Sequence, residues 1–301
     1  MSNSFTNIQR GKNTHWRYFS SLLVILAFMI ILGGLAYIIV GFAVGILNPE
    51  LLDLELLETK GTILSDPLAE FYLVHITYIV TILGVWLAVK TILKRNLTSL
   101  ITPNDKVSWS RIFYGFFISL AIFALFALLD FAIFPDSYAL NDFDATRFLW
   151  LVMASLVLVP IQTTSEELLF RGFLLQWAGK LTRNPLFLTL IVGGIFGGLH
   201  FFNPEMQHGA FWVAIDYLAM GFIWTYITVK TNSSEYSIGA HAANNMFLCI
   251  FLTMEDTVVG DIPSLFVMTE VNAMLSAMTT VITGLIFLFF VLRKQRKESN
   301  V

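Results

Sequence analysis

The sequence predicts an all-α membrane protein, a polytopic bundle of about eight transmembrane helices. Of its 301 residues, 56% are hydrophobic and only 13% are charged, about half the charged fraction of a soluble domain. Long apolar runs recur along the whole chain, and most reach the roughly 20 residues that a helix needs to cross the hydrocarbon core. These observations exclude an ordinary soluble domain. We expect an integral multi-pass protein that lies in the lipid bilayer and has no nucleic-acid partner.

The apolar runs fall at residues 20–47, 68–93, 112–134, 148–176, 186–202, 210–229, 236–254 and 270–292. The first run is too long for a signal-peptide core, so we expect an uncleaved first span. The fourth run is interrupted by Pro160 and the polar letters QTTS, which predicts a kink or a restarted helix near Thr164. The acidic, partly apolar loop from Asn48 to Pro67 favours a short amphipathic helix.

Basic residues collect before the first span, in alternate loops and in the C-terminal tail, whereas acidic residues such as Asp53, Asp142, Glu255 and Asp256 fill the other loops. This alternation predicts that both termini face the cytoplasm. No organelle-targeting sequence is visible, and we expect the bacterial plasma membrane. We divide the chain into three spans with their loops (1–147), a core of spans four to seven (148–254), and the last loop, eighth span and basic tail (255–301).

Three charged side chains lie close together in the fourth span, within the segment TTSEELLFRGFLLQ. A charge at mid-bilayer costs roughly 2.5 to 3.5 kcal/mol on insertion scales, so Glu166, Glu167 and Arg171 need partners or a hydrated cavity. On a helix, Glu167 and Arg171 are four residues apart and can form an ion pair. Glu166 then points about 100° away and is free for chemistry. The alternative is a capping box, in which Thr164 and Glu167 open a helix after Pro160.

Two histidines lie in other predicted spans. His200 ends the segment FGGLH, one turn after Phe196, and a lone intramembrane histidine is more often a packing residue. His241 has Asn245 four residues further on, with Asn244 beside it, which favours a functional role for the set. A carboxylate and an imidazole can remove a proton from water, and a second imidazole with a carboxamide can stabilise an oxyanion. These side chains therefore indicate the attack of water on a carbonyl group.

The same segments resemble a known family. EELLFRG is similar to the EExxxR signature, FGGLH to FxxxH and HAANN to HxxxN of the CAAX-protease and bacteriocin-processing family of intramembrane proteases, which includes the Rce1-type proteases. The resemblance covers roughly residues 148–252 and implies an intramembrane endopeptidase that acts on membrane-embedded or lipidated peptides or proteins. It implies that Glu166 is the general base, that His200 helps to activate water, that His241 and Asn245 stabilise the oxyanion, and that Glu167, Arg171 and Phe196 support the site.

Other interpretations stay open. Glu166, His200 and His241 could form a three-ligand zinc site with water as the fourth ligand. Because no HExxH motif is present and Asn245 suits an oxyanion partner better than a metal ligand, we favour a mechanism without an obligatory metal or other cofactor. The same polar residues would also serve a proton-coupled transporter. A bacteriocin immunity or regulatory binding protein could use this fold without proteolysis.

Two further intramembrane residues have less specific interpretations. Asp216, in the sixth span, could orient a histidine or Arg171, or make a simple hydrogen bond between helices. His75 lies near the outer end of the second span, and we expect it to have a structural role.

Overall fold

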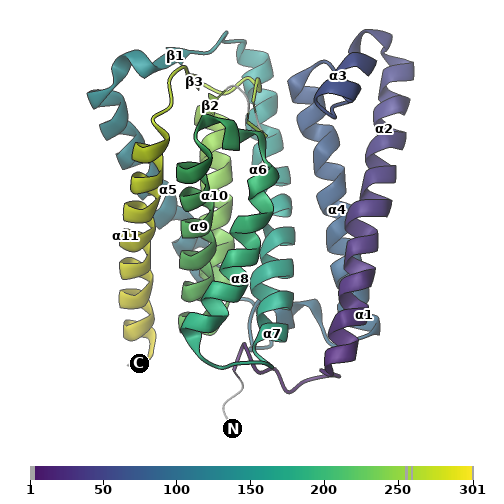
Figure 1. The fold of residues 1–301 in the computed structure, drawn as a ribbon, viewed down its shortest axis with the longest axis vertical. Helices are drawn as coiled ribbons and strands as arrows, with labels where there is room; N and C mark the ends of the chain where they lie inside the picture. The colour runs from purple at the N-terminus through teal and green to yellow at the C-terminus, as the bar shows by residue number, and fades with distance from the viewer. Residues whose placement is uncertain (1–3, 255–256, 259, 300–301) are drawn as a thin grey trace.

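The computed structural model describes residues 4–254, 257–258 and 260–299, which form a bundle of long helices with one small sheet at one end (Figure 1). The helices are α1 (His15–Leu26), η1 (Ala27–Leu32), α2 (Gly33–Leu47), η2 (Pro49–Leu51), α3 (Leu54–Thr59), α4 (Pro67–Thr91), η3 (Leu97–Leu100), α5 (Trp109–Ile133), η4 (Pro135–Ser137), α6 (Ala145–Glu167), η5 (Leu168–Leu174), α7 (Leu175–Ala178), α8 (Pro185–Leu199), η6 (His200–Phe202), η7 (Pro204–His208), α9 (Ala210–Thr231), α10 (Glu235–Phe251) and α11 (Ala273–Ser299). The strands are β1 (Tyr138–Leu140), β2 (Leu252–Met254) and β3 (Phe266–Met268).

Seven helices of the described residues are long and apolar enough to cross a membrane. They are His15–Leu47, Pro67–Thr91, Trp109–Ile133, Ala145–Ala178, Pro185–Phe202, Ala210–Thr231 and Ala273–Glu298, which correspond to seven of the eight predicted spans. The remaining predicted span is α10, whose 17 residues lie at the short end of the range for a crossing and are mostly buried inside the bundle. The predicted class, an all-α membrane bundle, is confirmed.

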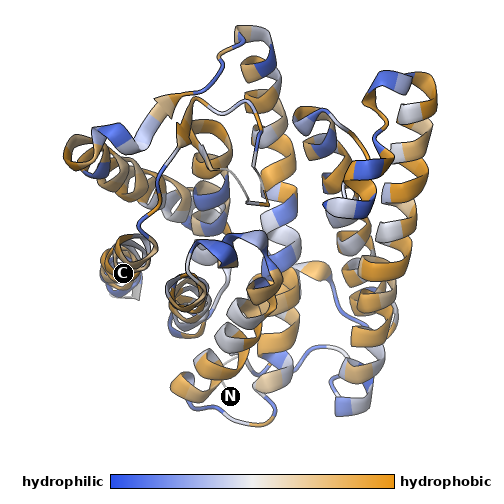
Figure 2. Ribbon diagram, turned by 45° about the horizontal axis from the view of Figure 1, so that its top comes forward, coloured by the Kyte–Doolittle hydropathy of each residue, from blue (hydrophilic) through white to orange (hydrophobic). Residues whose placement is uncertain are grey.

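The outer faces of the helices are largely hydrophobic, and the hydrophilic residues gather in the loops (Figure 2). Both ends of the chain lie at the same end of the bundle, opposite the small sheet (Figure 1). The predicted helix in the loop after the first span is α3, which begins at Asp53, whose carboxylate accepts hydrogen bonds from two backbone amides. Of the acidic residues expected in the loops, Glu255 and Asp256 lie outside the described residues.

The fourth span differs from the prediction. Helix α6 has Asp144 as its N-cap and passes through Pro160 without restarting near Thr164, so the capping-box interpretation of Glu167 is wrong. Pro160 removes only one backbone hydrogen bond, the one that the Leu156 carbonyl would accept, and the helix continues on both sides of it. The chain departs from α-helical geometry only after Glu167, in the π-helical segment η5. Such segments often mark functional sites.

Helices α8 and α9 approach each other closely at a pair of glycines. A methyl group added to Gly193 would lie 2.7 Å from the backbone of Gly221, whereas one added to the neighbouring Gly194 would meet nothing nearer than 3.9 Å. Small residues at this crossing therefore bring the two backbones together, as the glycine-rich segment predicted. The contact places the end of α8, which carries His200, beside α9.

The three-stranded sheet was not predicted. Strand β3 pairs antiparallel with β1 and parallel with β2, so it connects the chain that precedes α6, the end of α10 and the chain that leads into α11. Each strand has only three residues, too few for an alternating pattern to be visible in the sequence.

Candidate active site

The predicted ion pair between Glu167 and Arg171 is confirmed, and both side chains are fully buried. Arg171 Nη1 lies 2.9 Å from Glu167 Oε1. The guanidinium carbon also lies 3.9 Å from the ring centre of Phe196 and 5.5 Å from that of Trp224, distances at which a cation interacts favourably with an aromatic face. These contacts compensate a charge that would otherwise be costly inside a membrane bundle.

The imidazole of His241 lies between the two adjacent glutamates. Its Nδ1 is 3.0 Å from Glu167 Oε1, and its Nε2 is 3.9 Å from Glu166 Oε2. A carboxylate can only accept, so Nδ1 carries the proton of the shorter contact, and Nε2 faces Glu166. A separation of 3.9 Å is too long for a direct hydrogen bond, and it leaves no room for a water molecule between the two atoms.

The two glutamates differ in their access to solvent. The side chain of Glu166 is 17% exposed, whereas that of Glu167 is completely buried. Glu167 is committed to Arg171 and His241, while Glu166 remains open to a water molecule or a substrate. The expected division between one neutralised and one available carboxylate is therefore present in the structure.

Asn245 lies one helical turn after His241 on α10. Its Oδ1 accepts a hydrogen bond of 3.1 Å from the amide of Asn244, so its own amide group is the donor that can meet a substrate. Trp224, on α9, packs against the His241 ring with 4.6 Å between ring centres. A small cavity of about 30 Å³ between α5, α9, α10 and α11 has Trp224 and Asn244 in its wall, enough room for one water molecule.

His200 occupies the end of α8, at the first residue of η6. Its Nδ1 lies 2.7 Å from the Phe196 carbonyl oxygen, which fixes the proton on Nδ1 and leaves Nε2 as an acceptor. Its ring packs between Phe196 and Tyr217, at 4.5 Å and 4.7 Å between ring centres. In the part of the chain that the structure describes, its side chain makes this hydrogen bond and none to Glu166 or His241.

Phe196 contacts both His200 and the other groups of the site. Its ring contacts His200, lies 5.9 Å from the His241 ring and faces the Arg171 guanidinium. The structure thus groups Glu166, Glu167, Arg171, His241 and Asn245 closely, and places His200 at their edge.

The zinc arrangement does not fit these positions. Among the described residues, no group of three or more His, Cys, Asp or Glu side chains is placed to hold a metal ion. The Nδ1 atoms of His241 and His200 are bonded to Glu167 and to the Phe196 carbonyl, which leaves the two Nε2 atoms as the ones that could bind a metal.

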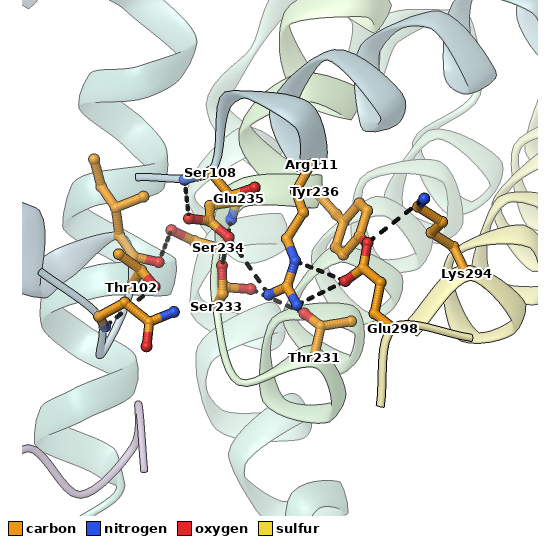
Figure 3. Close-up of polar contacts among 12 residues, drawn as sticks. Thr102, Ser108, Arg111, Thr231, Ser233, Ser234, Glu235, Tyr236, Lys294 and Glu298 are labelled. Atoms are coloured by element: carbon orange, nitrogen blue, oxygen red, sulfur yellow. Dashed lines mark hydrogen bonds and ion pairs between the residues drawn. The ribbon is translucent and has the colours of Figure 1, made fainter. Parts of the chain in front are cut away.

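The start of α10 is held by a buried carboxylate, Glu235, at the end of the bundle that carries both termini (Figure 3). Glu235 accepts hydrogen bonds from the Ser108 amide at 2.6 Å and the Ser233 hydroxyl at 2.8 Å, and lies 3.6 Å from Arg111. Arg111 in turn donates two hydrogen bonds to Glu298 of α11, at 3.0 and 2.7 Å. This network links α5, α10 and α11, and it fixes the helix that carries His241.

Asp216 makes a hydrogen bond between helices, as one of the two interpretations expected. Its Oδ2 accepts from the Ser276 hydroxyl of α11 at 3.4 Å. It does not orient Arg171, whose described hydrogen bond is to Glu167.

Sequence reasoning missed two aromatic neighbours of the site, Trp224 and Tyr217. Tryptophans gather near span ends, so the position of Trp224 in the middle of a predicted span was a usable signal. Tyr217 carried no such signal, because its contact with His200 depends on how the loop after α8 folds back.

Comparison with known proteins identifies the family of this chain. Residues 145–247 match the family model described as type II CAAX prenyl endopeptidase, Rce1-like. The chain is 51% identical to YyaK of Bacillus subtilis (strain 168), an uncharacterized protein, over 298 residues that cover 99% of this chain and 98% of YyaK. No solved structure matches the chain. The protein is an integral membrane protein and belongs to the Rce1-like family of type II CAAX prenyl endopeptidases.

Proposed function

We propose that the protein is an intramembrane endopeptidase that hydrolyses peptide bonds of membrane-embedded or lipidated peptides or proteins. The observation that carries the proposal is the position of His241 Nε2, 3.9 Å from Glu166 Oε2, with Asn245 one turn away on the same helix. This arrangement supports a base and two oxyanion donors that act on the same substrate carbonyl group.

In the proposed reaction, Glu166 takes a proton from a water molecule beside its exposed side while the water oxygen attacks the substrate carbonyl carbon. The carbonyl oxygen becomes an oxyanion, which receives hydrogen bonds from protonated His241 and from the amide of Asn245. The peptide C–N bond then breaks, and the proton held by Glu166 passes to the departing amine. His200, through its free Nε2, orients the incoming water.

Glu167 supports the reaction through His241. A carboxylate bonded to Nδ1 holds the ring with Nε2 toward the substrate, as the orienting acid of a catalytic triad does. Arg171 holds this carboxylate in place.

We further propose that the end of the bundle with both termini faces the cytoplasm and that the host membrane is a bacterial plasma membrane. The distribution of basic residues supports this orientation. Since the candidate ligands do not converge, we propose that activity does not require a bound metal. Activity that survives dialysis against a strong chelator, and is not raised by added Zn²⁺, is the expected result.

The test is cleavage in proteoliposomes of membrane-inserted reporter peptides, with and without a C-terminal lipid. Glu166→Gln should abolish cleavage, while Glu58→Gln, at an exposed position in α3, should leave it unchanged. Undiminished cleavage by Glu166→Gln would rule out the proposed base. The lipidated and unmodified reporters together show which substrate class is preferred.

A further inference from the structure

A second cavity lies at the end of the bundle that carries both termini, where α4 ends and the chain turns into η3 (Figure 1). Its volume is about 420 Å³, which is within the range of small-molecule sites. None of the residues in its wall belongs to the candidate active site or to residues 145–247, which match the family model. The cavity is therefore a separate feature of the molecule.

The described residues in the wall of this cavity are all polar, and their charges do not balance. Four are basic, Arg10, Lys90, Lys94 and Arg95, and one, Asp105, is acidic. Asp105 is already paired with Arg10, at 2.6 Å between its Oδ1 and Arg10 Nη1. Among the described residues, no carboxylate oxygen lies within 4.0 Å of a charged nitrogen of Lys90, Lys94 or Arg95. The cavity thus gathers three cations that the described protein does not neutralise.

Arg95 is the most buried of these cations, with 4% of its surface exposed. Its Nη1 donates to the Gln176 side-chain oxygen at 3.0 Å, and its Nη2 donates to the Tyr18 hydroxyl at 3.4 Å. Both partners are neutral, and Arg95 Nε has no acceptor among the described residues. A buried guanidinium group loses its hydration, and a carboxylate or phosphate partner normally offsets that loss. An anionic ligand in the cavity would stabilise this charge.

Lys94 has a backbone conformation that glycine usually adopts. Its φ is +54°, in the left-handed region, at the turn that follows α4. The Arg95 amide closes this turn by donating to the Val89 carbonyl at 3.1 Å. Glycine is the common residue at such helix ends, because a side chain is strained there. A lysine at this position is a cost to stability, which favours a use for its charge.

Lys90 places the cavity at the level of the lipid headgroups. It lies in the last turn of α4, one helical turn after Trp86 and on the same face. Trp86 is 48% exposed, and Trp16, near the start of the neighbouring helix α1, is 71% exposed. Exposed tryptophans near the ends of spans are typical of the membrane interface. Basic cavities between helices at this depth suit the phosphate groups of anionic lipids.

We infer that this cavity binds a phosphate group, with the buried Arg95 and the exposed Lys90 and Lys94 as its cationic partners. The position of the cavity at the membrane interface favours the headgroup of an anionic phospholipid as the source of that phosphate. Arg95 supplies directed N–H donors, and the two lysines supply compact charges. The inference does not depend on the proposed peptidase activity, and its test involves no cleavage.

The test counts the lipids that the full-length protein retains in a neutral detergent, by native mass spectrometry. The probes are phosphatidic acid, phosphatidylglycerol and phosphatidylcholine with the same acyl chains. We expect one anionic lipid per chain at concentrations at which phosphatidylcholine is not retained. Lys90→Gln and Lys94→Gly should each weaken this binding about fivefold. Lys180→Gln removes an exposed lysine at the same end of the bundle, outside the cavity wall, and should leave binding unchanged.

Lys94→Gly separates ligand binding from a structural role. Glycine relieves the left-handed backbone, so this variant should unfold at the wild-type temperature or above it while it binds the anionic lipid more weakly. A lysine with only a structural role would not give this combination. Anionic lipid binding that is unchanged in both Lys90→Gln and Lys94→Gly overturns the inference.

Water-soluble phosphates distinguish the two sources of the ligand. Thermal unfolding of the wild type and of Lys94→Gly is measured with glycerol phosphate and with inorganic phosphate. Selective retention of anionic lipids without stabilisation by the soluble phosphates assigns the cavity to a lipid headgroup. Stabilisation of the wild type by a soluble phosphate, reduced in Lys94→Gly and without lipid selectivity, assigns it to a free phosphate compound. Equal retention of anionic and neutral lipids, together with no effect of the soluble phosphates, overturns the inference.

Discussion

His241 makes its short contact with Glu167, 3.0 Å from Nδ1 to Oε1, and leaves Nε2 facing Glu166 across 3.9 Å. Two identical and adjacent side chains therefore have different environments. One is enclosed with Arg171 and contacts the histidine, and the other is partly exposed. This asymmetry leads directly to different expectations for the two glutamates.

We expect Glu167→Gln to destabilise the fold, and Glu166→Gln to leave its stability almost unchanged. Removing the Glu167 charge leaves Arg171 buried without its counter-ion, which costs about 3 to 5 kcal/mol. Glu166 makes no such buried pair with Arg171 Nη1, and its side chain is partly exposed. Thermal unfolding in detergent measures the difference. Equal melting temperatures for the two variants would contradict the buried ion pair.

The glycine-rich helix α8 offers a matched pair of substitutions. Gly193→Ala should destabilise the protein by about 1 to 3 kcal/mol, because the added methyl group meets the Gly221 backbone at 2.7 Å. Gly194→Ala should be neutral or slightly stabilising, since its methyl group has room and alanine favours helix. Thermal unfolding compares them directly. A similar loss of stability in both variants would mean that the close contact between Gly193 and Gly221 is not responsible.

The network at the start of α10 can be tested at its two carboxylates. Glu235 is fully buried and accepts from Ser108 and Ser233, so Glu235→Ala should cost about 2 to 3 kcal/mol of stability. Glu298, whose side chain is 28% exposed, pairs with Arg111, and Glu298→Ala should cost about 1 kcal/mol or less. Unfolding measurements should rank the variants in this order, and the reverse order would show that α11 contributes more than the buried contacts.

Local features of this protein could be predicted from its sequence. Most spans are defined by composition alone, and the Glu167–Arg171 pair by a spacing of four residues on one helix. The short helix α3 was predicted from the acidic, partly apolar composition of its loop. Each of these depends on residues that are close together in the chain, where helix geometry leaves few alternatives.

Features that depend on distant residues could not be predicted. His241 and Glu167 are 74 positions apart, and the sequence did not indicate which of two adjacent glutamates the histidine would meet. The π-helical segment η5 rotates the residues after Glu167 relative to their positions in an α-helix. No residue type in this segment predicts a π-helix. Pro160 suggested a restarted helix near Thr164, but α6 continues through both residues.

Helix α10 is anchored at both ends, by Glu235 where it starts and by the pairing of β2 with β3 directly after its last turn. A helix restrained in this way cannot slide along its axis without breaking a buried hydrogen-bond network or a sheet. His241 and Asn245 therefore keep their place relative to the rest of the bundle. In the proposed reaction, room for a peptide has to come from displacement of the surrounding helices, such as α4 or α8, around this stationary element.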